Sequence, residues 1–172
     1  SINRYNDNLI PLLRPEERLS YDILITRGSQ SVGKLSCTIS MDAQDWIARA
    51  DSVEDKKIQM ECYKRAIEIN PDADEAHIAL GRLYEGEQKY RQAIPEYEAV
   101  IRIKPDNVQA LTSLAALYKK TGDQARVIDL YEKLAKVDSS RADEHYYQAA
   151  LAAEKQGADA RAIELYQNVL AA

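Results

Sequence analysis

The sequence has 172 residues, of which 45% are hydrophobic and 30% charged, and its formal net charge is −5 at pH 7. These values are typical of a folded protein with a sizeable core, not of a disordered chain. The negative charge argues against a general nucleic-acid binder, because such proteins usually carry a basic face. No window approaches the roughly 20 apolar residues of a membrane-spanning helix. We therefore expect neither nucleic acid as a partner nor an integral membrane segment.

The first 40 residues are interpreted as an extension that contains two strands. Residues 19–26 and 35–40 are rich in β-branched and aromatic side chains, and Gly28 and Gly33 lie between them. The pattern predicts two strands joined by an eight-residue loop. Because an isolated hairpin is only marginally stable in water, we expect these strands to pack on the following helices or to pair with another chain.

The segment from Gly28 to Lys34 resembles a phosphate-binding P-loop in the spacing of its glycines and lysine. A P-loop also needs Ser or Thr after the lysine to bind magnesium, and a helix whose N-terminus faces the phosphate. Here Leu35 occupies the hydroxyl position, and the residues after it have the composition of a strand. A flexible hairpin loop is therefore favoured over a nucleotide site.

The residue types that usually carry chemistry lack suitable neighbours in the sequence. Cys37 and Cys62 match no metal-ligand spacing and form no disulfide framework. We expect reduced thiols, which slightly favours a cytoplasmic protein over a periplasmic or membrane-peripheral one. His77 is expected to pack inside a helix pair, and His145 to lie at a helix start. The sequence predicts no catalytic residue, no metal and no cofactor.

From about residue 41 onward, apolar residues recur at steps of three and four, as one buried helix face requires. Pro71 and Pro105 are 34 residues apart, and each follows a similar alternating stretch. A fixed period of this size is typical of stacked helix pairs, each of which buries its apolar face against its neighbours. It predicts four units, at about residues 41–73, 74–107, 108–141 and 142–172.

Polar residues and glycines mark the ends of these helices. Asp72 and Asp106 follow the two prolines, where an aspartate side chain can cap the next helix. Gly122 and Gly157 lie at turns where a positive φ is expected. Ser139-Ser140-Arg141 replaces the proline expected in the last interval, and we expect it to form a loop that accommodates one extra residue.

The units resemble the tetratricopeptide repeat, whose pattern is W-x2-L-G-x2-Y, then A-x3-F, then P. The second unit carries His77-x2-Leu80-Gly81-x2-Tyr84, Ala93-x3-Tyr97 and Pro105. The others carry Ala43-x2-Trp46-Ile47-x2-Ala50 with Gln59-x3-Tyr63 and Pro71, Leu111-x2-Leu114-Ala115-x2-Tyr118 with Val127-x3-Tyr131, and Tyr146-x2-Ala149-Ala150-x2-Ala153 with Ala162-x3-Tyr166. The resemblance implies a mostly α fold, a right-handed α-α superhelix of about four helix pairs. In that family the first helix of each pair lines a concave groove that binds extended peptides or partner helices.

Tyrosines recur in phase with the units. They lie in the second predicted helix at Tyr63, Tyr97, Tyr131 and Tyr166, and in the first at Tyr84 and Tyr118. This spacing predicts core positions, with each ring packed between neighbouring helices.

Positions off the buried stripe, on the same side of successive first helices, are predicted to line the groove. They are Gln44 and Ala48 in the first unit, Ile78, Arg82 and Glu85 in the second, Thr112, Ala116 and Lys119 in the third, and Tyr147, Leu151 and Glu154 in the fourth. Apolar members can anchor a partner, and the cations can orient it by pairing with carboxylates. A subgroup of the family clamps chaperone C-termini with polar groups, for which this chain has Ala48, Ala116 and Leu151. That ligand is disfavoured.

The favoured hypothesis is a non-enzymatic scaffold or adaptor that binds a peptide or partner segment in this groove. The alternative is a structural subunit of a larger assembly or homo-oligomer, because no further polar helix follows the last unit. Self-association would then use the uncapped C-terminal repeat or the N-terminal strands. A nucleotide-binding protein is the third hypothesis and depends on the segment from Gly28 to Lys34 alone.

Overall fold

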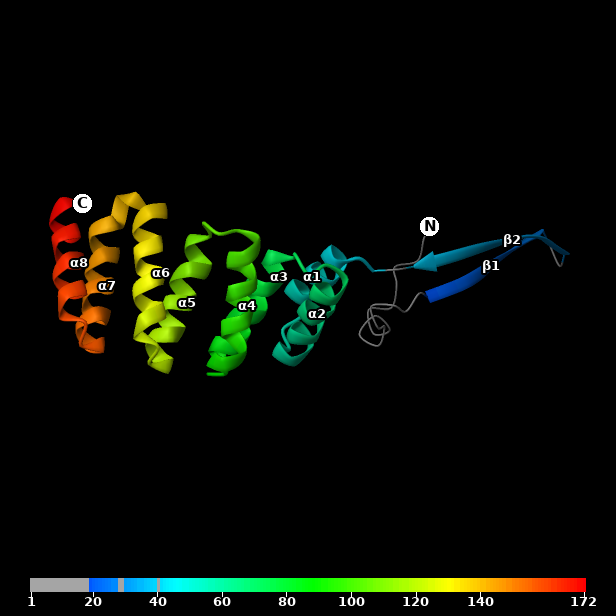
Figure 1. Cartoon of the computed structure of the whole chain (residues 1–172). Helices are drawn as coiled ribbons and strands as arrows, with labels where there is room; N and C mark the ends of the chain where they lie inside the picture. The colour runs from blue at the N-terminus through cyan, green and yellow to red at the C-terminus, as the bar shows by residue number, and fades with distance from the viewer. Residues whose placement is uncertain (1–18, 28–29, 40) are drawn as a thin grey trace. The chain divides into compact units, whose positions relative to one another are not determined.

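The computed structural model describes residues 19–27, 30–39 and 41–172. The chain divides into two compact units, residues 1–76 and 77–172. The first unit contains a β-hairpin and one helix pair, and the second contains the remaining helices (Figure 1). The rest of the predicted extension, residues 1–18, lies outside the described residues.

The hairpin consists of β1 (Leu19–Arg27) and β2 (Gln30–Ile39), which pair antiparallel. The two predicted strands are confirmed, but the predicted eight-residue loop is wrong because residues 30–34 belong to β2. Lys34 lies opposite Leu24, and β2 continues beyond it without a helix. A P-loop requires a helix after its lysine, so the P-loop interpretation is contradicted.

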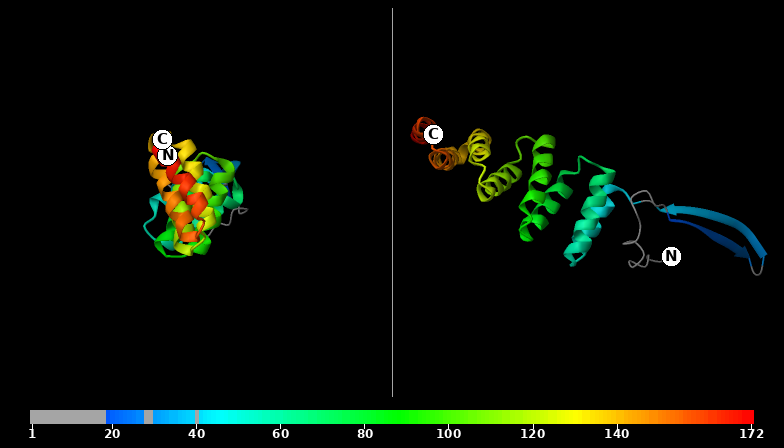
Figure 2. Two further views of the ribbon diagram at one scale, coloured as in Figure 1. Left: turned by 60° about the vertical axis from the view of Figure 1, so that its left-hand side comes forward. Right: turned by 60° about the horizontal axis from the view of Figure 1, so that its bottom comes forward.

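The first unit contains α1 (Ala43–Ser52) and α2 (Lys56–Ile69). The other helices are α3 (Asp74–Gly86), α4 (Tyr90–Ile103), α5 (Val108–Thr121), α6 (Gln124–Val137), α7 (Ala142–Gln156) and α8 (Asp159–Ala171). In the second unit, the helices from α4 to α8 each pack on the next one in chain order (Figure 2). The predicted helix-pair solenoid is confirmed.

Local sequence signals explain where several helices begin and end. Asn107, not the predicted Asp106, caps α5, because its side chain accepts a hydrogen bond from the Ala110 N–H at 2.9 Å. Gly122 and Gly157 adopt the predicted positive φ, at 88° and 77°. A single 3-10 turn, η2 (Ser139–Arg141), accommodates the extra residue between α6 and α7.

The core of the second unit is built from aliphatic side chains and tyrosines. Tyr97 is fully buried, and Tyr84 and Tyr118 are nearly so. Tyr131 and Tyr166 are only half-buried, so the predicted core position is wrong for these two. A Cβ at position 81 would lie 3.0 Å from two atoms of the Tyr97 ring. Glycine at this position therefore allows α3 and α4 to approach closely.

Candidate functional site

The predicted groove residues are all at least partly accessible to solvent. Exposed members are Gln44, Ala48, Arg82, Thr112, Lys119, Tyr147 and Glu154, and half-buried members are Ile78, Glu85, Ala116 and Leu151. Tyr147 stands out because 45% of this large aromatic residue remains exposed. Accessibility is a requirement for partner binding, and each predicted position meets it.

In the second unit, two polar bridges connect the first helices of successive pairs. With its amide oxygen facing Arg82, Gln109 accepts hydrogen bonds from Nη2 at 2.7 Å and from Nε at 3.3 Å. Lys119 Nζ donates to Gln148 Oε1 at 3.3 Å. The bridges run from α3 to α5 and from α5 to α7. Two predicted groove residues, Arg82 and Lys119, thus each contact the first helix of the following pair. We call the predicted groove positions on α3, α5 and α7 the first-helix face.

A tyrosine in the second helix donates a hydrogen bond to a carboxylate near the end of the first helix. Tyr97 Oη donates to Glu85 Oε2 at 2.8 Å, and Tyr63 Oη donates to Asp51 Oδ1 at 2.5 Å. The partners in both pairs are 12 residues apart. Burial, followed by the hydrogen bond to Glu85, raises the pKa of Tyr97 above its usual range. Glu85, which we predicted as a groove residue, is therefore already held by its own repeat.

The same spacing relates Tyr166 to Glu154 in the last repeat. Burial raises the pKa of Tyr166, and the charge of Glu154 and a hydrogen bond to it add to the effect. The Tyr166 ring also lies 6.0 Å from the Tyr147 ring, tilted by 57°. Glu154 thus resembles Glu85 in serving a contact within its repeat, and Tyr147 is held in place by α8.

The third repeat lacks this tyrosine–carboxylate pair. Its equivalent tyrosine is Tyr131, and Lys119, a residue that cannot accept a hydrogen bond, stands at the carboxylate position. Tyr131 instead stacks on His145, with ring centroids 6.2 Å apart. Lys119 consequently extends towards Gln148 on the first-helix face. Sequence reasoning missed this regularity, although an acidic residue 12 positions before three of the four tyrosines was a visible signal.

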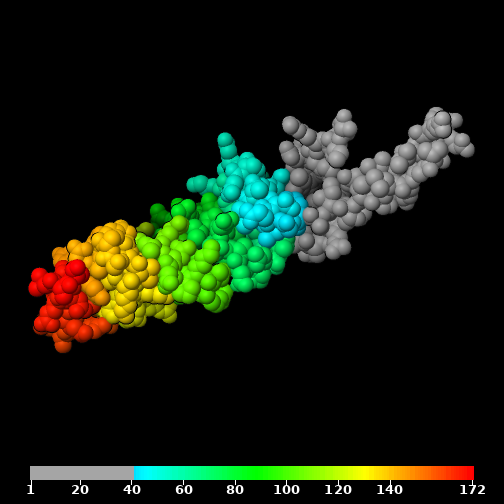
Figure 3. Space-filling view, turned by 90° about the horizontal axis from the view of Figure 1, so that it is seen from above, coloured from blue at the N-terminus to red at the C-terminus, as the bar shows by residue number. Residues whose placement is uncertain are grey.

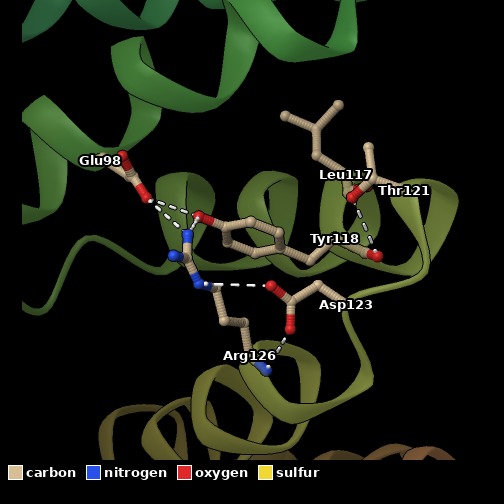
Figure 4. Close-up of polar contacts among 6 residues, drawn as sticks. All are labelled: Glu98, Leu117, Tyr118, Thr121, Asp123 and Arg126. Carbon is tan, nitrogen blue, oxygen red and sulfur yellow. Dashed lines mark hydrogen bonds and ion pairs between the residues drawn. The ribbon is translucent and has the colours of Figure 1, made fainter.

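A second polar cluster connects α4, α5 and α6 in the second unit (Figure 4). Tyr118 Oη donates to Glu98 Oε1 at 2.5 Å, and Arg126 contacts both groups, with its guanidinium 4.9 Å from the Tyr118 ring centroid. Asp123 caps α6 by accepting from the Arg126 N–H at 3.2 Å. A hollow of about 260 Å³ lies beside this cluster. Its members are satisfied by each other, which favours a structural role in tying two repeats together.

The first unit has a hollow of about 490 Å³ beside the predicted groove residue Gln44. It lies at the start of α1, the end of α2 and the start of α3, and its charged lining is acidic, with Asp42, Asp72, Asp74 and Glu75. Asp42 forms a capping box with Asp45 at the start of α1. Carboxylates at the start of a helix cap its free N–H groups and favour its dipole, so these acidic residues have a structural role beside any role in binding.

Metal and membrane signatures are both missing from the part of the chain that the structure describes. Within it, no group of three or more His, Cys, Asp or Glu side chains could hold a metal ion. No described helix combines the length and the apolar character needed to cross a bilayer.

Comparisons with known proteins support the repeat fold. Residues 74–107, which contain α3 and α4, match the family described as Tetratricopeptide repeat. No curated protein sequence matches the chain. Among solved structures, the chain is similar to a crystal structure of MamA, with a TM-score of 0.61, 18% identity, and coverage of 74% of this chain and 76% of that one. MamA residues 41-end from Desulfovibrio magneticus RS-1 give a TM-score of 0.54, 19% identity, and coverage of 74% and 71%.

A tetratricopeptide repeat protein from Parabacteroides merdae ATCC 43184 is also similar, with a TM-score of 0.60 and 19% identity. The match covers 74% of this chain and 52% of that one. At these identities the structural similarities establish the fold alone. The surface of the second unit is built from successive helices in chain order (Figure 3).

Proposed function

We propose that this chain, a tetratricopeptide repeat protein, is a scaffold that binds an extended segment of a partner protein on its first-helix face. The observation that supports the proposal is the pair of polar bridges that connect α3 with α5 and α5 with α7. These bridges show that side chains of successive first helices lie within reach of each other, so that one extended ligand can contact several repeats.

The chemistry of the face supports a protein ligand. Tyr147 and Leu151 offer apolar surface on α7, and aromatic anchors of this kind commonly dominate binding energy. Arg82 and Lys119 supply cations on α3 and α5. Glu85 and Glu154 are engaged by tyrosines of their own repeats, whereas Arg82 and Lys119 contact neutral glutamine oxygens, which a carboxylate of a partner can replace. We therefore assign the recognition of a partner to Arg82, Lys119, Tyr147 and Leu151, with Ile78, Thr112 and Ala116 as surrounding contact area.

The proposal is tested with peptides selected from a random display library on the wild-type protein. Tyr147→Ala should weaken binding of the selected peptide by about tenfold or more, as expected for an aromatic anchor. Ile163→Ala is the matched control, because Ile163 is 60% exposed on α8 and is not part of the first-helix face. Titration calorimetry measures both affinities, and circular dichroism verifies that both variants keep their helical content. Equal affinities of the two variants would place the binding surface elsewhere.

Self-association is a second candidate, favoured by apolar exposure on α8. Ile163 is 60% exposed and Leu170 is 90% exposed. Light scattering across a range of protein concentrations tests this candidate. A mass that rises with concentration in the wild type and less in Leu170→Glu supports it, whereas a monomer at every concentration contradicts it.

A further inference from the structure

A hollow of about 430 Å³ lies at the turn between α3 and α4, next to the end of α5. It is lined by Gln88, Lys89, Tyr90, Arg91, Gln92 and Thr121. None of these belongs to the predicted groove set, and the helical period places Thr121 roughly opposite Thr112 and Ala116 on α5. We call it the Tyr90 hollow, and it is a surface separate from the first-helix face.

The turn that forms this hollow is held firmly by its backbone. Gln88 has a φ of 59°, which is uncommon for a residue other than glycine. Its N–H donates to the Glu85 carbonyl, and the Lys89 N–H donates to the Tyr84 carbonyl, both at 2.9 Å. These bonds close the end of α3 as a left-handed cap does. The backbone of the turn that carries Gln88 and Lys89 is thus defined by hydrogen bonds within the protein itself.

Positive charge gathers around the hollow, although the whole chain is negative, with a net charge of −5. Lys89 and Arg91 line it, and Lys120 places Nζ 4.8 Å from the centroid of the Tyr90 ring. The carboxylate of Glu87 pairs with Lys89 Nζ at 2.7 Å. Among the described residues, no hydrogen bond or ion pair holds the exposed side chain of Arg91.

The cations also sit where they oppose helix stability. The start of α4 has no acidic residue in its first turn, and Lys89 provides no side-chain cap. The positive end of the helix dipole lies here, so Lys89 and Arg91 are unfavourable for the helix by themselves. A negatively charged ligand would remove this penalty. The unfavourable placement is of the kind that proteins retain at functional sites.

We propose that the Tyr90 hollow is a second docking site, which binds an acidic segment of a protein partner. Carboxylates of the segment would pair with Arg91, Lys120 and the positive end of α4, while an apolar side chain would lie against the Tyr90 ring. Charge complementarity selects this partner over a basic peptide, and the negative charge of the remaining surface opposes a long nucleic acid.

The probe is a fluorescent peptide rich in glutamate with leucines between, compared with a peptide in which every glutamate is lysine. Fluorescence anisotropy at low salt should show binding of the acidic peptide only, and the affinity should fall as salt screens the charges. Arg91→Glu should weaken it by about tenfold. Arg102→Glu is the matched control, since it makes the same charge change in the last turn of the same helix. Arg91→Glu should also raise the melting temperature, because a carboxylate suits the start of α4.

A second pair of variants lies on other helices. The affinity for the acidic peptide is compared between Lys120→Gln, which removes a cation beside the hollow, and Lys136→Gln, which removes a cation in the last turn of α6. Tyr147→Ala should leave this affinity unchanged, which separates the hollow from the first-helix face. The proposal is overturned if Arg91→Glu and Arg102→Glu weaken binding equally, or if the lysine peptide binds as tightly. Tighter binding of a single-stranded oligonucleotide than of the acidic peptide would overturn it as well.

Discussion

At the scale of single residues, the tyrosine–carboxylate pairs connect stability with the chemistry of the surface. Tyr97 forms a hydrogen bond with the carboxylate of Glu85, which the sequence alone assigns to the groove. In the third repeat, Lys119 replaces that carboxylate and reaches the neighbouring helix instead. The same structural position thus forms a contact within its own repeat in one case and a contact between repeats in the other.

Removing the tyrosine hydroxyl tests how much the hydrogen bond to the carboxylate contributes to the free energy of unfolding. Tyr97→Phe should lower the free energy of unfolding by about 1 kcal/mol, because it removes a hydrogen bond to a carboxylate that is partly buried. Tyr131→Phe is the matched control, since no hydrogen bond joins its hydroxyl to a carboxylate among the described residues, although the charge of Glu144 adds to the burial that raises the pKa of Tyr131. Urea denaturation of the two variants measures the difference. Equal losses would mean that the contact with Glu85 adds nothing to stability.

A second residue-scale prediction concerns Asp138, which lies between α6 and α7. Hydrogen bonds from Ser140 and Arg141 lower the pKa of its carboxyl from 3.8 to about 2. A group with a lowered folded-state pKa stabilises the protein above its unfolded pKa, and loses that contribution as the pH falls through the folded value. The difference in the free energy of unfolding between wild type and Asp138→Asn should therefore be largest at pH 5. It should decrease to near zero as the pH falls from about 4 to about 2.

Denaturation midpoints across this pH range measure that gap. Asp129→Asn, an exposed position on α6, is the control, and its gap to wild type should change less with pH. A gap for Asp138→Asn that stays constant down to pH 2 would contradict the assigned role of the carboxylate.

At the scale of elements, the contact between α3 and α4 depends on a glycine packed against an aromatic ring. The Tyr97 ring cannot easily move away from position 81, since it is fully buried and its hydroxyl is hydrogen-bonded to Glu85. Gly81→Ala should therefore destabilise the protein by about 1–2 kcal/mol, even though alanine favours a helix.

Gly86→Ala, at the end of the same helix, is the matched control. A Cβ there meets no atom within 4 Å, so this change should be neutral or stabilising by up to about 1 kcal/mol. Thermal unfolding of the two variants compares them directly. A Gly81→Ala variant as stable as Gly86→Ala would show that the interface has room for a methyl group.

Whole-molecule organisation was the part of the structure most accessible from sequence. Proline spacing and helical periodicity predicted the helix pairs. The same pattern recurs in four units, so a helix that is ambiguous in one unit is identified by its equivalents in the others. The hairpin loop was mispredicted because glycines suggest turns, whereas backbone pairing places Gly33 opposite Ile25. Asn107 and Asp106 could not be distinguished as caps, since both side chains can accept the same hydrogen bond.

The candidate site was harder to predict from sequence than the fold. Periodicity assigns a residue to a face of its helix, but it does not reveal which side chains are already bonded within the protein. Glu85 and Glu154 look like groove residues by position, and only the tyrosines opposite them reveal their other role. The Tyr90 hollow depends on a turn geometry that no repeat pattern encodes.

The central claim is that a partner segment binds along α3, α5 and α7, and methyl and amide NMR shifts during titration with a display-selected peptide test it most directly. Shifts of Ile78 and Leu151 methyl groups, and of the amides around Thr112 and Lys119, are predicted to move together with one affinity. Signals of Ile163 on α8 should stay in place. Shifts confined to α8, or to the second helices α4 and α6, would contradict the account.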